Sequence, residues 1–314
     1  MYEVLTMGEP MGLLAAEEEK QLKDVSRFTR YICGAEVNFC IGLARLGHIP
    51  AYVSRIGKDP FGQHIREYLG DSGIAEDYLW TDDTYLTGMQ LKAKNAKGDP
   101  EVINYRHDTA FAHFKPEDLA KINWDGVRHV HLTGIPAALS MNCLTATEML
   151  MGMAHARNVR ISFDPNLRPA LWPDKAEMVT IINSLAQNAD IVLPGINEGD
   201  ILTGSRQPEK IADFYLERGV KTVVVKLGAE GAYVKTAHEK GFVVPGYPVK
   251  KVVDTVGAGD GFAVGVVSAL LEDEPLFDAV QRGAAIGALA VMSAGDNEGL
   301  PDRETLTEYM RKLH

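Results

Sequence analysis

The segment Asp254–Phe262, with the sequence DTVGAGDGF, contains three glycines and an alanine, and an apolar run to Leu271 follows it. Backbone amides in such a segment are uncovered, and the positive end of the helix that follows attracts anions to them. Asp260 lies among these amides. Because a carboxylate there would repel phosphate, its presence indicates a base that takes a proton from an attacking hydroxyl.

Two interpretations of this segment are open. In the first, Asp260 is a catalytic base and the amides hold a transferred phosphoryl group. In the second, the segment is a glycine-rich turn and Asp260 is an ordinary carboxylate at a helix start. If Asp260 is a base, the positive helix end should lower its pKa and leave it a weak base. A weak base suffices when the proton leaves late, after the new oxygen–phosphorus bond has begun to form.

Length and charge limit the class of protein. The chain has 314 residues, which suits one large α/β domain or one domain with a small appendage. Hydrophobic residues make up 46% of it, charged residues 24%, and the formal net charge is −11. An acidic chain argues against a nucleic-acid partner, which needs clustered lysine and arginine. It does not exclude an anionic small-molecule substrate, because a local pair of arginines decides that.

The cysteines and apolar segments predict the compartment. The chain has three cysteines, Cys33, Cys40 and Cys143. An odd number does not suit a disulfide framework, and their spacing is not that of a metal site. Both observations favour a reducing environment. The N-terminus lacks a basic region followed by a long apolar segment, and the stretch 283–295 is too short to span a bilayer. We therefore expect a cytoplasmic protein that has no membrane partner.

Short apolar or β-branched runs alternate with amphipathic helical patterns along most of the chain. This alternation predicts an α/β fold with a doubly wound parallel sheet. Ligands of open α/β sheets bind at the carboxyl ends of the strands, so the glycine and polar residues that follow several strands should converge on one crevice. Predicted strands cover 3–7, 51–56, 127–132, 159–163, 191–193, 222–226 and 232–235, and predicted helices cover 36–46, 61–71, 143–157, 175–187, 208–218, 261–272, 275–293 and 303–312.

Two segments, 13–31 and 87–113, interrupt the alternation. The first is polar without a helical period, and the second has two extended runs around a Gly98–Pro100 turn, as in a β-hairpin. We expect them to form a small β-sheet lid over the substrate, with residues 1–12, 32–86 and 114–314 as the core domain. The alternative is an edge extension of the main sheet. An exposed lid edge would also suit pairing with a second subunit, which predicts a homodimer through the lid.

The segment Asp254–Phe262 resembles the C-terminal signature of the ribokinase-like (PfkB) carbohydrate kinases. The N-terminal half of that family's pattern is present in residues 34–47, GAEVNFCIGLARLG, and residues 57–62, GKDPFG. The resemblance covers essentially the whole chain. It implies the ribokinase-like fold and a kinase that uses ATP and Mg²⁺ and acts on a sugar or sugar acid.

The resemblance also assigns the phosphoryl-transfer and nucleotide residues. It implies that Asp260 is the base and that the amides of Gly257, Ala258 and Gly259 form the anion hole. Residues 226–231, KLGAEG, resemble the family's nucleotide loop, although a tight turn between two strands explains the same glycines. Glu198 resembles the glutamate of an Asn-x-x-Glu motif that reaches magnesium through water, but Gly195 stands in place of its Asn. Nucleotide contacts are expected at Asn166, Arg168, Lys226, Gly228, Gly231, Gly257 and Gly259.

Residues 164–172, DPNLRPALW, and residues 104–110, NYRHDTA, resemble segments of 2-keto-3-deoxygluconate kinases. Arg106 and Arg168 would then face one crevice, and an arginine fork suits a carboxylate that a neutral hexose lacks. One arginine could instead balance phosphates. Asn104 and Gln90 replace aromatic residues of that group. Sugar contacts are expected at Gly34, Asn38, Gln90, Tyr105, Arg106, Arg168 and Asp260.

These features predict ATP-dependent phosphorylation of the terminal hydroxyl of 2-keto-3-deoxygluconate, with a fructokinase or another sugar kinase as the alternative. A nicotinamide dehydrogenase would need Gly-x-Gly-x-x-Gly, and the glycines at 257, 259 and 261 have the wrong third spacing. A sugar-binding relative without catalysis is the non-enzymatic alternative. The presence of Asp260 argues against it, and Gly195 is its only support.

Overall fold

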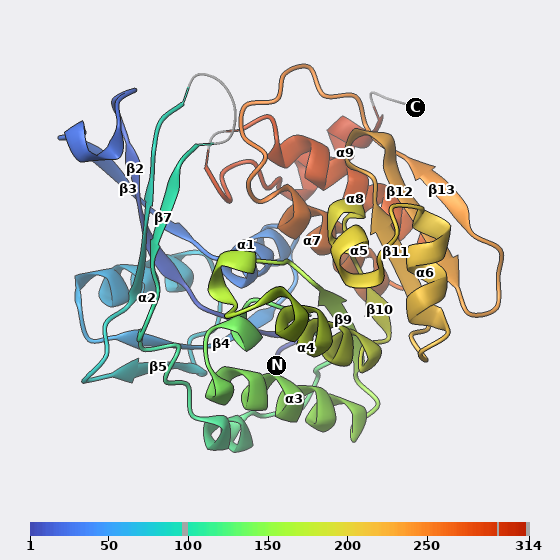
Figure 1. The fold of residues 1–314 in the computed structure, drawn as a ribbon, viewed down its shortest axis with the longest axis horizontal. Helices are drawn as coiled ribbons and strands as arrows, with labels where there is room; N and C mark the ends of the chain where they lie inside the picture. The colour runs from blue at the N-terminus through green and yellow to red at the C-terminus, as the bar shows by residue number, and fades with distance from the viewer. Residues whose placement is uncertain (96–99, 294, 312–314) are drawn as a thin grey trace.

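The computed structural model describes residues 1–95, 100–293 and 295–311, and its strands form two separate sheets (Figure 1). The larger sheet has the strand order β13-β12-β11-β10-β9-β8-β1-β4-β5. Neighbours from β5 to β11 are parallel, whereas β12 and β13 continue antiparallel. The strands are β1 (Val4–Met7), β4 (Pro50–Gly57), β5 (Leu79–Asp82), β8 (His129–Thr133), β9 (Arg160–Asp164), β10 (Ile191–Val192), β11 (Thr222–Lys226), β12 (Gly231–Thr236) and β13 (Phe242–Pro245).

Helices cover both faces of the larger sheet, because successive side chains of its strands point to opposite faces and both sets are apolar. Along β4, Tyr52 belongs to the core beneath α1, α2, α7, α8 and α9, and Val53 belongs to the core beneath α3, α4, α5 and α6. The predicted doubly wound α/β class is confirmed. The helices are α1 (Ala35–Arg45), α2 (Pro60–Asp71), α3 (Met141–His155), α4 (Lys175–Gln187), α5 (Ile196–Thr203), α6 (Pro208–Leu216), α7 (Ala258–Leu271), α8 (Leu276–Ala290) and α9 (Arg303–Arg311).

The smaller sheet is a layer of its own rather than an edge extension of the larger one, and it stands at the left of Figure 1. Its order is β3-β2-β6-β7, with β2 and β6 parallel and the outer pairs antiparallel. The predicted hairpin is present as β6 and β7, and residues 96–99 of its connection, with most of the expected 98–100 turn, lie outside the described residues. The strands are β2 (Met11–Ala16), β3 (Phe28–Cys33), β6 (Gly88–Lys92) and β7 (Val102–Tyr105), so the sheet extends beyond the expected 13–31 boundaries.

Among the described strands and α-helices, β5, β13 and α5 were not anticipated from the sequence. Helix α5 contains Gly199, a residue of low helix propensity. Glycine fits there closely, because a Cβ atom would crowd the side chain of Ile211 on α6 and Ile211 would have to shift. Strand β13 ends in Pro245, which a strand tolerates at the edge of a sheet. Packing between neighbouring elements therefore outweighs the unfavourable local propensities of Gly199 and Pro245.

The direction of winding changes at the centre of the larger sheet. After β1 the chain adds β4 and β5 on one side, and after β8 it adds β9, β10 and β11 on the other. The helices that follow β1 and β8 consequently lie on opposite faces, which opens a crevice at the carboxyl ends of these two strands. This is the switch point at which a ligand site is expected.

Cys33, Cys40 and Cys143 are buried and form no disulfide. Within the parts of the chain that the structure describes, no helix is both long enough and apolar enough to cross a membrane.

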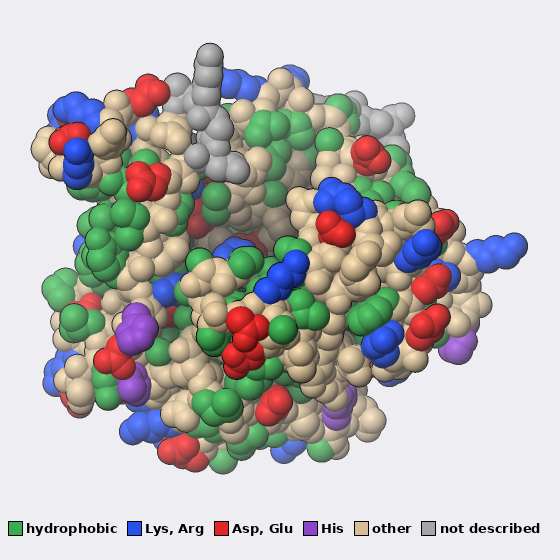
Figure 2. Space-filling model, viewed as in Figure 1, with side chains coloured by type: hydrophobic (Ala, Val, Ile, Leu, Met, Phe, Trp, Pro, Cys, Tyr) green, Lys and Arg blue, Asp and Glu red, His purple; other side chains and the backbone are tan. Residues whose placement is uncertain are grey.

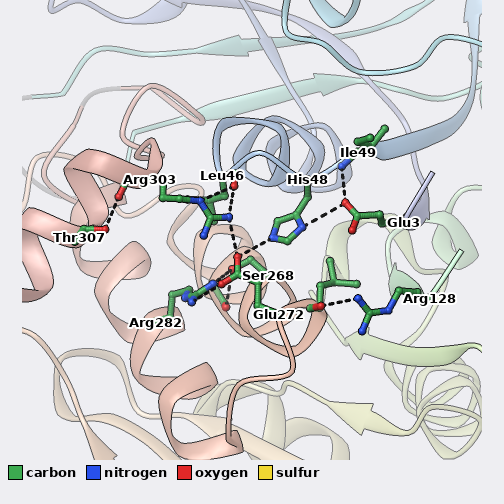
Figure 3. Close-up of polar contacts among 12 residues, drawn as sticks. Glu3, Leu46, His48, Ile49, Arg128, Ser268, Glu272, Arg282, Arg303 and Thr307 are labelled. Atoms are coloured by element: carbon green, nitrogen blue, oxygen red, sulfur yellow. Dashed lines mark hydrogen bonds and ion pairs between the residues drawn. The ribbon is translucent and has the colours of Figure 1, made fainter. Parts of the chain in front are cut away.

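Glu272 connects three helices at the end of the molecule where α7 stops (Figure 3). Its Oε1 lies 2.7 Å from Nη2 of Arg303 on α9, and its Oε2 lies 2.8 Å from Nη2 of Arg282 on α8. Nε2 of His48 is 3.3 Å from Oε1. Partial burial opposes ionisation of Glu272. The hydrogen bonds from Arg303 and Arg282 outweigh this effect and lower the pKa of Glu272 to about 2.

Glu272→Gln is expected to lower the free energy of unfolding by about 1–2 kcal/mol at pH 7, because glutamine keeps the shape but not the charge that faces two arginines. The folded pKa lies below the ordinary glutamate value of 4.5. The stabilisation is therefore complete above that value and is lost as the pH falls toward 2. Urea unfolding of both proteins between pH 7 and about pH 3.5 measures this difference.

The difference should be constant down to about pH 5 and should shrink below it. Glu304→Gln, at an exposed position on α9, is the matched control and should change stability by less than about 0.5 kcal/mol. A difference that stays the same at every pH would contradict the electrostatic explanation.

Candidate active site

A cavity of about 570 Å³ lies between the smaller sheet and the carboxyl ends of the larger one. The space-filling view shows the molecule hollowed between these two parts (Figure 2). The cavity thus occupies the switch point. From the larger domain it is lined by residues that include Gly34, Glu36, Asn38, Asp164, Asn166, Arg168, Glu198, Lys226, Gly257, Gly259 and Asp260, and from the smaller sheet by residues that include Gln90, Lys92 and Val102.

Asp260 lies partly buried in the first turn of α7 and is held by two amide side chains. Nδ2 of Asn38, on α1, donates to Oδ2 of Asp260 at 2.8 Å. Nδ2 of Asn166, which follows β9, lies 3.4 Å from Oδ1. The structure therefore brings together three expected site residues from separate parts of the sequence, and the two amides orient the carboxylate.

The pKa of Asp260 differs from the expectation. Burial raises it to about 6 despite the hydrogen bond from Asn38, and the nearby carboxylate of Asp164 raises it further. The expectation that the helix end would leave a weak base is therefore wrong, because desolvation outweighs the helix dipole. A carboxylate with a pKa near neutrality is well matched to proton abstraction at physiological pH.

The N-terminus of α7 opens onto the cavity next to Asp260. Gly257 has a φ of +78°, which favours glycine, and a Cβ atom there would overlap the backbone carbonyl oxygen of Asp296. Gly257 and Gly259 line the cavity, and Ala258 is the first residue of the helix. Uncovered amides at the end of a 14-residue helix form a suitable site for an anion.

Lys226, at the end of β11, adds a cation to this region. Its Nζ lies 2.6 Å from Oδ2 of Asp164, at the end of β9. A Cβ atom on Gly259 would be 3.6 Å from the same Nζ, which places the ammonium group beside the helix start. Lys226 therefore complements the amides for a bound phosphate.

Glu198 lines the cavity but is engaged with the backbone. Its Oε1 accepts a hydrogen bond from the amide of Leu167 at 2.8 Å, and its Oε2 accepts one from the amide of Gly195 at 2.7 Å. Burial raises its pKa. Among the described residues no group of three or more metal-ligating side chains occurs. A magnesium ion that is bound with a nucleotide is held largely by phosphates and water and needs no such group.

Arg106 and Arg168 both line the cavity, as the sequence predicted. Arg168 is exposed and donates to its neighbour's carbonyl oxygen at 3.0 Å. Arg106 is buried, and its Nε donates to Oε2 of Glu9 at 2.7 Å. The hydroxyl of Thr109 donates to the other oxygen of Glu9. Arg106 is consequently anchored by a buried carboxylate, which balances part of its charge.

Two other expected sugar contacts also line the cavity. Gly34 precedes α1 with a φ of +143°, and a Cβ atom there would lie 2.7 Å from the carbonyl oxygen of Glu9. Nε2 of Gln90 donates to Oδ1 of Asn104 at 2.8 Å, on the inner face of the smaller sheet. Tyr105 is the exception, because alternation along β7 places it on the outer face, where it is 52% exposed.

The expected nucleotide loop is the connection between β11 and β12. Gly228 and Gly231 lie in the connection between β11 and β12 with φ values of +64° and +98°, and neither is among the described lining residues. A Cβ atom on Gly231 would overlap the carbonyl oxygen of Val244. The turn and the packing of β13 therefore account for Gly231.

Sequence reasoning assigned no site role to five carboxylate and lysine residues that line the cavity: Glu9, Glu36, Lys92, Asp164 and Asp296. A signal existed for Lys92, because it is two residues from Gln90 and thus on the same face of the strand. Burial raises the pKa of Glu36 to about 7, although the hydroxyl of Thr133 donates to it. No sequence pattern pointed to Asp296.

A second cavity, also about 570 Å³, lies at the amino ends of β8, β9, β10 and β11. Two charged residues that line it are paired with each other, since Nζ of Lys221 is 2.6 Å from Oδ1 of Asp190. Arg128 donates to the carbonyl oxygen of Leu271 at 2.7 Å. The cavity that contains Asp260 is therefore the better candidate for chemistry.

The fold and the Asp260 cavity together define a kinase of the ribokinase-like class. Residues 1–303 match the sequence model described as "pfkB family carbohydrate kinase", and the chain belongs to this family.

Relatives support this assignment over the full length. A 2-dehydro-3-deoxygluconokinase of Bacillus subtilis (strain 168) is 45% identical over 309 residues, which cover 98% of this chain and 95% of the relative. The crystal structure of a PfkB protein from Polaromonas sp. JS666 matches with a TM-score of 0.89 at 42% identity, covering 98% and 99% of the two chains. A putative ribokinase II from E. coli, solved with ATP and Mg²⁺, matches with a TM-score of 0.90 at 26% identity and covers 99% and 100%.

Proposed function

We propose that this kinase uses ATP to phosphorylate the terminal hydroxyl of 2-keto-3-deoxygluconate. The observation that carries the proposal is the position of Asp260, which lies partly buried beside uncovered helix amides in a cavity that two arginines also line. The name of the Bacillus subtilis relative, at 45% identity, supports the same substrate.

In the proposed reaction, Asp260 orients the sugar hydroxyl and removes its proton as the oxygen attacks the terminal phosphorus of ATP. The bond between that phosphorus and the oxygen that bridges it to the β-phosphate breaks, and ADP leaves. The amides of Gly257, Ala258 and Gly259 stabilise charge on the transferred phosphoryl group, and Lys226 adds a positive charge beside them. Asn38 and Asn166 hold the carboxylate in the attacking geometry. Magnesium, when bound with ATP, neutralises charge on the phosphates, and Glu198 would reach it through water.

The arginines support an acidic sugar over a neutral one. Arg168 is exposed in the cavity, and Arg106 is anchored through its Nε by Glu9. Anchoring one edge of a guanidinium group orients the other edge for a planar partner such as a carboxylate. Gly34, Asn38 and Gln90 are proposed to contact the sugar hydroxyls. We assign Asn166, Arg168, Lys226, Gly228 and Gly231 to the nucleotide side.

Residues 13–31 and 87–113 are proposed to act as the lid, which moves relative to the core domain and excludes water. The inner face of the smaller sheet supports this role, because Gln90, Val102 and Asn104 line the cavity opposite Asp260.

The first test is ATP consumption by the purified protein with magnesium, with 2-keto-3-deoxygluconate, fructose and ribose as acceptors. We expect kcat/KM for the keto-deoxy acid to exceed that for fructose by at least about 10², because a site built for a carboxylate leaves charged groups unpaired without it. Turnover on fructose with none on the acid would assign a fructokinase. No turnover on any of the three would contradict the proposal.

Asp260→Asn is expected to reduce kcat by at least about 10², because asparagine has a similar shape but cannot take the proton. In the wild type, kcat/KM should fall about tenfold per pH unit below about pH 6, since only the ionised carboxylate is active. Steady-state kinetics between pH 5 and 8 measure both effects. Full activity of the variant would eliminate Asp260 as the base.

The stability of the same variant is the control for folding. The folded pKa of Asp260 lies above its ordinary value of 3.8, so the ionised carboxylate destabilises the folded protein at neutral pH and protonation relieves this. The neutral asparagine should therefore unfold at the same or a higher temperature than the wild type. A lower melting temperature would show that the loss of activity has a structural cause.

We also propose that the protein is a homodimer joined through the outer face of the smaller sheet. The strand register places Met89 beside Tyr105 and Leu91 beside Ile103 on this face. Tyr105 and Ile103 are 52% and 36% exposed. Strand β7 also lies at the edge of its sheet. A second copy would cover both the apolar side chains and this edge.

Ile103→Lys is expected to convert the dimer to a monomer, because a buried lysine without a partner opposes association. Light scattering after gel filtration should give twice the chain mass for the wild type and the chain mass for the variant. Val243→Lys, at a 55% exposed position on edge strand β13, is the matched control and should leave the mass unchanged. A monomeric wild type would refute the proposed dimer.

A further inference from the structure

We propose that Lys92, on the smaller sheet, is a positioning residue that couples the lid to the phosphoryl-transfer site. It would do so through ion pairs with Asp254 and Asp296 on either side of the anion-binding segment. The proposal rests on the kinase function above for its catalytic consequence, but its structural part can be tested without turnover.

The side chain of Lys92 reaches from the smaller sheet to the core domain. It is the last residue of β6, on the inner face of the smaller sheet. Its Nζ lies 2.6 Å from Oδ2 of Asp254 and 3.4 Å from Oδ1 of Asp296, both in the core domain. The three side chains are 10%, 14% and 7% exposed. Ion pairs that are buried to this degree are held in one geometry, because separating the partners would leave a buried charge without a partner.

Asp254 connects Lys92 to the start of the anion-binding segment. While its Oδ2 accepts from Lys92, its Oδ1 accepts from the backbone amide of Val256 at 3.1 Å. The next residue, Gly257, is the left-handed glycine that precedes α7. Lys92 is therefore connected, through Asp254, to the turn that directs the amides of α7 toward the cavity.

Asp296 connects Lys92 to the same segment from the other side. Its backbone carbonyl oxygen packs so closely on Gly257 that no Cβ atom would fit. Its neighbour Asn297 is buried, and its Nδ2 lies 3.4 Å from Oδ1 of Asn38. Asn38 in turn donates to Asp260. A continuous set of contacts thus runs from the lid lysine to the partner of the proposed base.

Charge balance gives Lys92 a second effect on the site. One lysine faces two carboxylates, so the cluster already has an excess of negative charge beside a site for phosphates. Without Lys92, both carboxylates would be buried and unpaired. They would repel each other and the nucleotide, and the segments that contain them would move apart. Closure of the lid would therefore assemble the anion site and also reduce its negative charge.

The test compares Lys92→Met with Lys94→Met by hydrogen–deuterium exchange of the intact protein without ligands. Lys94 lies on the same lid segment, where it is exposed and contacts the backbone of Glu17, so its loss removes the same charge elsewhere. In Lys92→Met, peptides that cover 254–261 and 295–299 should exchange about tenfold faster. In Lys94→Met they should exchange as in the wild type.

Kinetics with ATP and the preferred sugar form the second arm. Lys92→Met should lower kcat by about 10- to 100-fold, because a displaced anion site loses alignment in the transition state. Lys92→Arg keeps the charge and should recover most of this loss, whereas Lys94→Met should remain within about twofold of the wild type. If Lys92→Met does not fold, Asp296→Asn replaces it and should change exchange and kcat in the same direction.

Each outcome decides the proposal. Unchanged exchange together with unchanged kcat would overturn it. A lower kcat with unchanged exchange would also overturn it, because Lys92 would then act by direct contact with a substrate. Faster exchange in Lys92→Met alone supports the coupling even if the wild type turns over none of the tested sugars, a result that would refute the proposed function separately.

Discussion

Parallel strands with apolar side chains on both faces need helices on both faces, and the remaining architecture follows from this requirement. In the larger sheet, adjacent residues such as Tyr52 and Val53 enter separate cores. The connections after β1 and β8 must therefore pass to opposite sides. The crevice between these connections is the place where backbone amides, side chains at strand ends and the smaller sheet meet. The reason is that the carboxyl ends of the parallel strands all lie on that side of the sheet.

The site in this crevice depends on an electrostatic conflict. Asp260 is largely shielded from water, which favours its neutral form, yet it lies at a helix start that favours negative charge. The balance raises its pKa to about 6. Asn38 and Asn166 stabilise the ionised form enough to keep it accessible, while the amides of Gly257–Gly259 remain available for phosphate. The same low dielectric that makes this carboxylate unfavourable for folding makes it a stronger base.

Much of the fold could be predicted because its signals are local. The periodicity of 175–187 and 222–226 predicted α4 and β11 with the bounds that the structure has. Helix α5 was missed because Gly199 lowers helix propensity, and its reason, contact with Ile211, is not local. The glycines around Asp260, by contrast, were informative because their effect on the backbone is local. Their spacing alone limits the backbone to conformations that expose amides.

Burial and side-chain direction could not be predicted to the same degree. The sequence by itself determined the family, the doubly wound class and the identity of the Asp260 segment, because these depend on periodicity and on residue types that are close in the chain. Only the tertiary structure decided that Tyr105 faces outward, that Glu9 holds Arg106, that Lys92 meets Asp254 and Asp296, and that Asp260 has a raised pKa. Each of these depends on which distant groups exclude water from a side chain or pair with it, and desolvation is a property of the assembled fold.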